Sequence, residues 1–470
     1  IADSLVNEGV SVLFTVAGSC GNGAIEVAGE RDIWAIGVDE DQYLTLPDSL
    51  KGVLLSSCIK DTRVTVYNIA KNYVDGKFNK GTMHKANLSN NGVAIAPYHD
   101  FENQIPENIK AKIEEIKNNI IMKDQIALNP NPLVQYLKKS ADDFTRADII
   151  KYVEDQNITM INFKYVAGDG RLKTLNFVIN SREYLENILT YGERVDGSSL
   201  FSFIEAGSSD LYVIPRYRTA FLDPFASLPT LSFLCSYFNK DGEPLESSPE
   251  YTLRKAHESF KHVTGMEFHA MGELEFYLIA DKDDLYPAND QKAYHESGPF
   301  AKFEQFRCSC MSLIAQTGGQ IKYGHTEVGC FTLGDKVYEQ NEIEFLPVPA
   351  EDAADQLVVA KWVIRSLAYE YGMNVTFAPK ITTGKAGSGL HIHMRIMKDG
   401  NNQMLKAGKL SSVARTAIAG MMACAPSITA FGNVNPTSYF RLVPHQEAPT
   451  NICWGDRNRS VLVRVPLGWT

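Results

Sequence analysis

Two histidines, His391 and His393, stand two positions apart in a strand-like segment that follows the glycine-rich turn 387–389. Side chains alternate across a strand, so both imidazole rings are predicted to lie on one face. The glycines allow the backbone to turn tightly and to approach a ligand closely. Imidazoles beside such a turn suit a metal ion with an anionic substrate. Taken alone, the stretch is better explained as a glycine turn that leads into an amphipathic strand.

Glutamates in other strand-like segments could face the same site. Glu273 and Glu275 lie two positions apart beside the apolar run 276–279, so a strand would place both on one face. Two unpaired carboxylates against a core are costly, and a bound divalent cation is the usual relief. Glu327 and Glu342 add further carboxylates in similar surroundings. Oxygen ligands with an occasional imidazole favour Mg²⁺ or Mn²⁺ over zinc.

Arginines gather near the end of the chain, with Arg441 in one stretch and Arg457, Arg459 and Arg464 in another. Guanidinium groups bind phosphate and carboxylate through two parallel hydrogen bonds. Alone, such a cluster is typical of a solvated or salt-bridged surface. Beside a site of metal ions and carboxylates, it suits a nucleoside triphosphate.

Length and composition indicate what class of protein contains these residues. The chain has 470 residues, 44% hydrophobic and 22% charged, as in an ordinary soluble protein of about three domains. The net charge of −10 argues against general nucleic-acid binding, which needs clustered basic residues. No apolar run approaches the ~20 residues of a membrane span. The eight scattered cysteines show no zinc-like pairing and are expected to be free thiols.

Residues 1–125 alternate strand and helix signals. Apolar runs predict strands at 12–16, 34–38, 53–55 and 93–96. Helical patterns cover 61–73 and 106–121. Such alternation is typical of an α/β fold with a parallel sheet and helices on both faces. The glycine loop 18–23 after the first strand could cradle a phosphate, although its spacing is weak evidence for that.

Four short motifs lie in this region: VAG at 16–18, GNG at 21–23, AIGVDEDQ at 35–42 and AIAP at 94–97. Together they resemble the basic membrane protein family, the substrate-binding lipoproteins of purine-nucleoside transporters, which have a two-lobed periplasmic binding fold. The resemblance implies that Asp39 is the ribose-binding aspartate and that Lys60 contacts the ligand. Only the later part of such a protein is present, so one side of the cleft is missing and we expect this lobe to bind no nucleoside.

Polar, proline-punctuated sequence over 126–141 predicts a linker or junction. Beyond it, Thr145 is an N-cap signal for a helix. Strand-like segments at 160–163 and 174–178 flank a Gly-Asp-Gly turn. These signals predict a small α+β domain over 142–245.

The last domain, over 246–470, opens with Ser248 and Pro249, an N-cap and first-turn pair for a helix. The spacing of apolar residues predicts a long helix over 350–371, which Gly372 ends. Its expected core positions are Ala353, Leu357, Ala360, Ile364 and Leu367.

Seven motifs follow one another between residues 131 and 470: DGSS at 196–199, GELEF at 272–276, FAPK at 377–380, GSGLHIH at 387–393, RLVP at 441–444, EAP at 447–449 and RNRS at 457–460. In this order they resemble glutamine synthetase. The resemblance implies a β-grasp domain over 142–245 and, over 246–470, a catalytic domain whose curved antiparallel sheet forms a funnel-shaped site. The implied reaction is the ATP-dependent condensation of glutamate with ammonia through γ-glutamyl phosphate, in the cytoplasm.

The resemblance also implies two metal sites, for Mg²⁺ or Mn²⁺. By motif, Glu275, Glu327 and Glu342 are the ligands of one ion. Glu273 and His391 are ligands of the second ion, on the path of the phosphoryl group. Two cations that neutralise the γ-phosphate and the developing acyl phosphate lower the barrier of such a reaction.

Substrate and catalytic roles follow from the same motifs. The residues expected at ATP, which is a substrate, are His393, Arg459 and Arg464. The residues expected to hold glutamate are Gly387, Arg441 and Glu342. Asp196 would take a proton from ammonium across a subunit boundary, Arg459 would steady the transferring phosphoryl group, and Glu447 would close the site on a flap. That geometry implies a homo-oligomeric ring.

Two departures from the family pattern matter. Fifteen positions separate Glu327 from Glu342, more than is usual in the family, so residues 329–338 are expected to form an inserted hairpin. The chain also stops at Thr470, before a motif with a further metal-ligand glutamate and a substrate arginine, and we expect it to be a poor enzyme. The tail of a binding protein thus precedes the front of a glutamine synthetase, through either a natural fusion or a misassembled reading frame.

Two alternatives to glutamine formation stay open. The chain could be a purine-nucleoside-binding protein of an ABC transporter, acting through its first lobe. Within the enzyme family, it could be a ligase that joins glutamate to a polyamine or to another amine.

Overall fold

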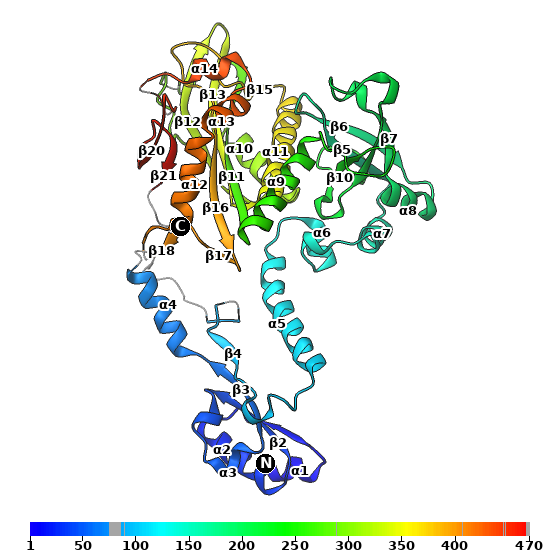
Figure 1. Ribbon diagram of the computed structural model, residues 1–470, viewed down its shortest axis with the longest axis vertical. Coiled ribbons are helices and arrows are strands. Elements are labelled where there is room, and N and C mark those ends of the chain that lie inside the picture. Colours follow the sequence, from blue (N-terminus) through cyan, green and yellow to red (C-terminus); the bar gives the residue numbers. More distant parts are fainter. Residues whose placement is uncertain are drawn as a thin grey trace. The chain divides into compact units, whose positions relative to one another are not determined.

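The computed structural model of the chain describes residues 1–74, 86–88, 90–287, 289–406, 408–444, 446 and 448–466. The chain divides into two compact units, Ile1–Leu128 and Asn129–Gly468, whose elements are labelled in Figure 1. Each unit is built around its own cluster of buried hydrophobic side chains.

The first unit contains a sheet with the strand order β1-β2-β3-β4. Its strands are β1 (Val12–Phe14), β2 (Trp34–Asp39), β3 (Leu54–Lys60) and β4 (Val93–Ile95). Its helices are α1 (Ala2–Asn7), α2 (Gly21–Glu30), α3 (Asp48–Lys51), α4 (Thr62–Val74) and α5 (Glu107–Ala127). Ile25 and Ala28, on one face of α2, form the core with Leu13, Ala35 and Leu54 from the sheet.

The direction of the last strand differs from the prediction. β1, β2 and β3 run parallel, as expected, but β4 runs antiparallel to β3. The prediction of an entirely parallel sheet is therefore wrong at this edge. Apolar residues mark a segment as a strand but not its direction, which depends on the end of the sheet to which the chain returns.

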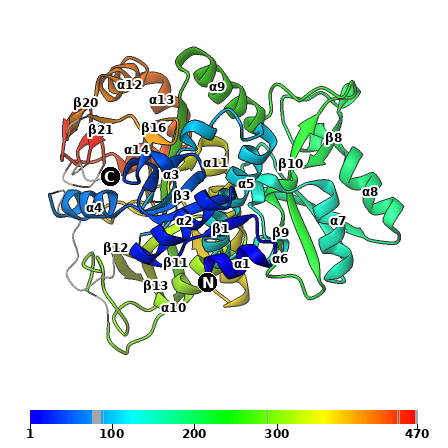
Figure 2. The ribbon, with the colours of Figure 1, turned by 90° about the horizontal axis from the view of Figure 1, so that it is seen from below.

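The second unit begins with the predicted small α+β domain. Its sheet has the order β6-β5-β10-β8-β7, with β9 also paired to β10. Its strands are β5 (Met160–Val166), β6 (Leu172–Val178), β7 (Glu193–Asp196), β8 (Asp210–Pro215), β9 (Phe221–Leu222) and β10 (Thr230–Phe238). β10 runs parallel to β5, and the other pairings are antiparallel. Helices α7 (Arg146–Asp155) and α8 (Arg182–Tyr191) pack against each other, and α8 contacts β8 (Figure 2).

The predicted N-cap of α7 is confirmed, and it is a complete capping box. Thr145 Oγ1 accepts a hydrogen bond from the Asp148 amide at 3.3 Å, and Asp148 Oδ2 accepts one from the Thr145 amide at 2.8 Å. These two bonds satisfy two amide donors that a helix start would otherwise leave unpaired.

Residues 126–141 contain more regular structure than the predicted linker. Within them, α6 (Pro132–Leu137) buries Leu133 and Val134. The Asn131 side chain caps this helix, and Pro132 occupies its first turn. An Asn-Pro sequence that looks like a break in structure therefore starts a helix here.

The rest of the second unit is built on an antiparallel sheet with the order β12-β13-β11-β16-β17, and β14 and β15 also pair with β11. Its strands are β11 (Glu267–Asp281), β12 (Ile321–Leu333), β13 (Lys336–Phe345), β14 (Val348–Pro349), β15 (Asn374–Thr376), β16 (Leu390–Lys398) and β17 (Asn401–Asn402). Its helices are α9 (Pro249–Thr264), α10 (Glu304–Gln316), α11 (Ala350–Glu370), α12 (Ser412–Ala423), α13 (Ala425–Gly432) and α14 (Pro436–Arg441). Two small pairs complete it, β18 (Leu405–Lys406) with β19 (Lys409–Leu410), and β20 (Asn451–Asp456) with β21 (Val461–Val465).

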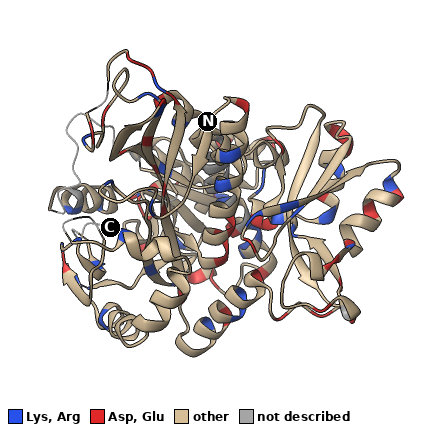
Figure 3. Ribbon diagram, turned by 90° about the horizontal axis from the view of Figure 1, so that it is seen from above, with Lys and Arg blue, Asp and Glu red and all other residues tan. Residues whose placement is uncertain are grey.

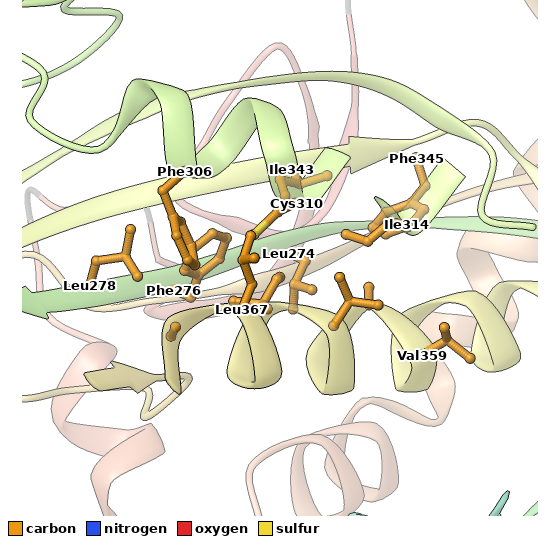
Figure 4. Close-up of a cluster of buried hydrophobic side chains, with 14 of the residues drawn as sticks. Leu274, Phe276, Leu278, Phe306, Cys310, Ile314, Ile343, Phe345, Val359 and Leu367 are labelled. Atoms are coloured by element: carbon orange, nitrogen blue, oxygen red, sulfur yellow. The ribbon is translucent and has the colours of Figure 1, made fainter. Parts of the chain in front are cut away.

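One face of this sheet packs on α10 and α11 (Figures 1 and 2). Leu274, Phe276 and Leu278 of β11 point into this core, where they meet side chains of β13, α10 and α11 (Figure 4). Because side chains alternate along a strand, Glu273 and Glu275 face the opposite side. The core therefore fixes the direction in which the glutamates point.

The predicted helices around the sheet are confirmed. Ser248 caps α9 through its hydroxyl group, with Pro249 in the first turn. α11 starts at Ala350 and ends just before Gly372, whose φ is +67°. Of the predicted core positions of α11, four are buried and Leu357 packs partly buried against the same core.

The predicted hairpin at 329–338 is also confirmed. β12 and β13 pair down to Leu333 and Lys336, joined by Gly334 and Asp335. Gly334 has a φ of +62°, which glycine adopts without strain. A bulge places residues 327–329 of β12 opposite a single residue of β13, and Glu327 lies in that bulge.

Charged residues of both signs are interspersed along the chain (Figure 3). Among the described residues, no single helix is long and apolar enough to cross a membrane. The bent pair α12 and α13 would pass that test only when the two helices are taken together, by length and composition.

Candidate active site

The strand register brings the predicted glutamates and histidines into one group. On β11, Glu273 lies opposite His391 of β16, and Glu275 lies opposite Glu342 of β13. Glu342 in turn lies opposite His325 of β12. Four neighbouring strands therefore contribute polar side chains to one face of the sheet.

Glu273 joins the two histidines. His391 Nδ1 donates a hydrogen bond to Glu273 Oε2 at 2.8 Å, and His393 Nε2 donates one to Glu273 Oε1 at 2.6 Å. Burial raises the pKa of Glu273, but these two bonds outweigh it and hold the pKa well below the usual range. Glu273 is therefore an ionised carboxylate, and its hydrogen bonds fix the orientation of both imidazole rings.

Glu275 is held by an amide side chain. Gln340 Nε2 donates to Glu275 Oε2 at 2.8 Å and to the Gly387 carbonyl at 3.0 Å, so it ties the glutamate to the glycine turn. Burial raises the pKa of Glu275, while His391 and the Gly389 amide act in the opposite direction. Gln340 binds Oε2 of Glu275, and the other oxygen, Oε1, points toward the glycine turn and Arg441.

Glu342 is a further carboxylate whose surroundings disfavour its charge. The residue is 5% exposed, and among the residues that the structure describes its carboxylate has no hydrogen-bond partner. Burial, followed by the charges of Glu275 and Glu273, raises the pKa of Glu342 to about 10. A proton or a cation must therefore neutralise this group at neutral pH.

The donor set fits a divalent cation. One ligand atom from each of His325, Glu327 and Glu342 lies within 4.8 Å of the other two, and the same holds for Glu273, Glu342 and Glu344. Carboxylate oxygens with few imidazoles are the ligands that Mg²⁺ and Mn²⁺ prefer. Glu342, which has no hydrogen-bond partner among the described residues, belongs to both groups, so a cation in either place would neutralise it.

The glycine turn is packed against Arg441, at the end of α14. Arg441 Nη2 lies 3.3 Å from His391 Nε2. A Cβ atom at Gly389 would lie 2.5 Å from Arg441 Nη2 and 2.9 Å from Glu275 Oε1, and one at Gly387 would collide with the Pro379 carbonyl. Both positions therefore require glycine, since any side chain would displace the arginine or the turn.

The second unit is similar to known proteins. The family model described as "Glutamine synthetase, catalytic domain" matches residues 246–469, and "Glutamine synthetase, beta-Grasp domain" matches residues 157–240. The glutamine synthetase of Thermus thermophilus is 30% identical over 339 residues, which cover 69% of this chain and 72% of that protein. The chain belongs to the glutamine synthetase family.

Other members of the glutamine synthetase family match over the same region. The enzyme of Frankia alni is 31% identical, with 69% of this chain and 74% of that protein covered. A solved structure of Plasmodium falciparum glutamine synthetase shares the fold with a TM-score of 0.63 at 20% identity, covering 70% of this chain and 69% of that one. Residues 1–129 match a different family model, "ABC transporter substrate-binding protein PnrA-like".

The structure brings seven of the predicted glutamine synthetase residues into contact or close range. They are Glu273, Glu275, Glu327, Glu342, His391, His393 and Arg441. Gly387 adjoins them through its carbonyl bond to Gln340. Two of the predicted ATP residues come from another element: Arg459 follows β20, and Arg464 lies on β21, which packs beside α12 (Figure 1).

Asp196 does not join this group within the chain. It ends β7, at the edge of the β-grasp sheet and away from β11 and β13 (Figure 1). Its exposed carboxylate accepts hydrogen bonds from the Ser199 hydroxyl at 2.6 Å and the Ser198 hydroxyl at 2.8 Å. These bonds hold the pKa of Asp196 well below its usual value. The other predicted catalytic residue, Glu447, lies outside the described residues.

Sequence reasoning missed Gln340 and Glu344. Each lies two positions from Glu342 on β13, so both side chains face the site. Glu344 also lies directly opposite Glu273. The signal was available, because residues two positions from a ligand on a strand point to the same side. A polar residue of β11, Tyr277, also faces the site and donates from its hydroxyl to the Ala386 carbonyl at 2.9 Å.

In the first unit, the two predicted nucleoside contacts lie together. Asp39 ends β2, Lys60 ends β3, and Lys60 Nζ lies 2.7 Å from Asp39 Oδ1. The carboxyl ends of parallel strands meet at one edge of a sheet, which explains the contact between residues 21 positions apart. The Lys60 side chain is 74% exposed and the Asp39 side chain 49% exposed.

Proposed function

We propose that this chain joins ammonia to glutamate in an ATP-dependent reaction through γ-glutamyl phosphate. Family membership supports the reaction class. The observation that carries the proposal is the buried carboxylate of Glu342, which lies without a hydrogen-bond partner in the described structure between the charges of Glu275 and Glu273. Bound cations would neutralise such a site, and phosphoryl transfer uses them.

Glu275, Glu327 and Glu342 are the proposed ligands of one cation, and Glu273 and His391 of a second. When bound, Mg²⁺ or Mn²⁺ ions neutralise the triphosphate and the charge on the transferring phosphoryl group. The chain's own contribution is orientation. Gln340 turns the Glu275 carboxylate toward the glycine turn. Glu273 fixes the two imidazoles through its hydrogen bonds.

Arg441 and Gly387 are the proposed glutamate-binding residues. The guanidinium group of Arg441 is packed beside the carboxylates and His391, so it can form a two-pronged pair with a substrate carboxylate. His393, Arg459 and Arg464 are assigned to ATP, where their positive charge or hydrogen-bond donors would meet phosphate. Arg459 is also assigned to the transferring phosphoryl group.

Asp196 is the proposed acceptor of the proton that leaves ammonium. Its lowered pKa keeps it anionic at neutral pH, so its charge can attract the ammonium cation. Because it lies on the far edge of the β-grasp sheet, we assign it to the site of a neighbouring subunit in a homo-oligomeric ring. Glu447 is assigned to the flap that closes the site.

The test is a glutamine-formation assay on the purified chain. ADP release should require glutamate, ammonium and Mg²⁺ or Mn²⁺ together, and glutamine should accumulate with it. Glu275→Gln should abolish this activity, whereas Glu370→Gln, at the exposed end of α11, should leave it unchanged. ATP turnover that does not depend on glutamate would contradict the proposal. A preference for a polyamine or methylamine over ammonium would instead identify another glutamate–amine ligase.

The Asp39–Lys60 pair and the match of residues 1–129 favour one alternative, a nucleoside-binding role for the first unit. We expect isothermal titration with guanosine or adenosine to show no binding. Tight binding that Asp39→Ala removes would support the alternative.

A further inference from the structure

Glu344 is a buried carboxylate that the proposed function leaves without a role. It lies directly opposite Glu273 across the β11–β13 pair and two positions beyond Glu342 on the same face. Its residue is 5% exposed. One carboxylate oxygen from each of these three glutamates lies within 4.8 Å of the other two.

Two side chains of the neighbouring strand hold Glu344. The Tyr323 hydroxyl donates to Glu344 Oε1, and Lys322 Nζ lies 2.9 Å from Glu344 Oε2. A carboxylate offers about four lone-pair positions, so these donors leave acceptor capacity on both oxygens. That remaining capacity faces Glu273 and Glu342, because the donors come from β12 on the other side.

The balance of charge around Glu344 indicates what its remaining acceptor positions bind. Five carboxylates gather on this face of the sheet: Glu273, Glu275, Glu327, Glu342 and Glu344. Lys322 and Arg441 offset only part of that charge. A structural ion pair with Lys322, whose side chain is 41% exposed, would not require Glu344 to be buried against two other glutamates. Glu342 is buried and has no hydrogen-bond partner in the described part of the chain, which indicates independently that a cation belongs between them.

We propose that Glu344 is a direct ligand of the cation assigned to Glu273 and His391, and that Glu342 reaches the same ion. This inference rests on the proposed function, because it adds a ligand to one of its two metal sites. The expanded set is three carboxylates and one imidazole, which favours a hard cation such as Mg²⁺ or Mn²⁺ over Zn²⁺. Tyr323 and Lys322 are positioning residues that hold the third carboxylate in place.

Titration of the full chain with Mn²⁺ alone tests this, because the electron paramagnetic resonance signal of free Mn²⁺ reports binding without turnover. Glu344→Gln should weaken one Mn²⁺ site about tenfold or more. Glu344→Asp, which keeps the charge but shortens its reach, should weaken that site less. Glu339→Gln removes a buried carboxylate from the same strand but the opposite face, and it should leave Mn²⁺ affinity unchanged.

Lys322→Met distinguishes two roles of Glu344, as a ligand of the cation and as a structural ion-pair partner of Lys322. If Glu344 binds the cation, removal of the competing ammonium group should leave the Mn²⁺ affinity unchanged or raise it. If Glu344 serves only to pair with Lys322, then Lys322→Met and Glu344→Gln should change the Mn²⁺ affinity by the same amount. Equal changes would overturn the inference. Unchanged Mn²⁺ affinity in Glu344→Gln would also overturn it.

Glu275→Gln distinguishes this inference from the proposed function. Weakened Mn²⁺ binding in Glu275→Gln with normal binding in Glu344→Gln would overturn only the role of Glu344. A wild-type chain that binds no Mn²⁺, or a Glu275→Gln variant with wild-type affinity, would overturn the metal sites of the proposed function as well.

Discussion

At the scale of single residues, the close packing around Gly389 offers a sharp test of the site. A methyl group at this position would meet both Arg441 and Glu275. Gly389→Ala must therefore displace one of them, and we expect glutamine formation to fall about 100-fold, as for a small misplacement of catalytic groups. Steady-state assays beside circular dichroism would show whether activity falls while the fold is retained.

Gly420→Ala is the matched control. Gly420 lies within α12, and a Cβ atom there would have nothing within 4 Å. Alanine is favoured over glycine inside a helix, so this variant should keep full activity with equal or higher stability. Equal activity in Gly389→Ala and Gly420→Ala would contradict the proposed role of the glycine turn.

The sequence identified most of these residues because chemistry and spacing coincide in them. Glu273 with Glu275 and His391 with His393 follow the two-residue period of a strand, and the strands were visible as apolar runs. The partners across strands were not predictable from spacing, since register is set by tertiary pairing. The spacing of Glu344 from Glu342 places both on one face, but the position of Glu344 opposite Glu273 depends on that register.

At the scale of elements, the start of α7 carries a stability that depends on pH. Burial raises the pKa of Asp148, but hydrogen bonds from Lys139 and Thr145 outweigh it and lower the pKa overall. The ionised carboxylate therefore stabilises α7 above the usual aspartate pKa of about 4, and this contribution is lost as pH falls through the lowered value.

Asp148→Asn should reduce the stability of α7 by about 1 kcal/mol at neutral pH. The difference in the stability of α7 between this variant and the wild type should stay constant down to about pH 5 and become smaller below that pH. Hydrogen exchange of the amides in Arg146–Asp155, corrected for intrinsic rates, measures this local stability. A difference that widens as the pH falls would show that the carboxylate is not stabilising.

Helices were more predictable than strand directions. Caps and apolar periodicity identified α7, α9 and α11 because those signals are local to each helix. The direction of β4 and the start of α6 were predicted incorrectly or missed. The first depends on the path of the chain, and the second on whether an Asn-Pro pair interrupts a segment or caps a helix.

At the scale of the whole molecule, α11 joins the β-grasp domain to the catalytic sheet. Arg216 forms a two-pronged ion pair with Asp355, at 2.6 and 2.9 Å, and Arg218 pairs with Asp352. Lys164 Nζ lies 4.0 Å from the ring centroid of Trp362. These contacts couple the two domains, so we expect them to unfold together.

Asp355→Ala should lower the free energy of unfolding of this unit by about 3 kcal/mol, because it leaves the mostly buried charge of Arg216 unpaired. Asp241→Ala is the control, since it removes an exposed ion pair with Lys240, which contributes less than about 1 kcal/mol. Calorimetry would show the shift in melting temperature. Equal melting temperatures for the two variants would mean that the Arg216 pair does not couple the domains.

A chain that begins at Asn129 should form glutamine with the same kcat and KM as the whole chain. The first unit has a separate core and supplies none of the proposed catalytic residues. Steady-state assays of the two chains measure this directly. A loss of activity without loss of folding would show that the first unit takes part in the reaction. The division into a binding-protein part and an enzyme part was predictable from motifs.

The β12–β13 hairpin also determines how the length of this protein can change. Residues added in pairs at the Gly334–Asp335 tip lengthen both strands equally and leave Glu327 and Glu342 on the same face. A single added residue instead gives a three-residue loop, which usually carries a bulge beside the turn. Insertions of even length at this tip should therefore extend the hairpin with the least disturbance of the turn, and a foreign peptide of even length can extend both strands equally.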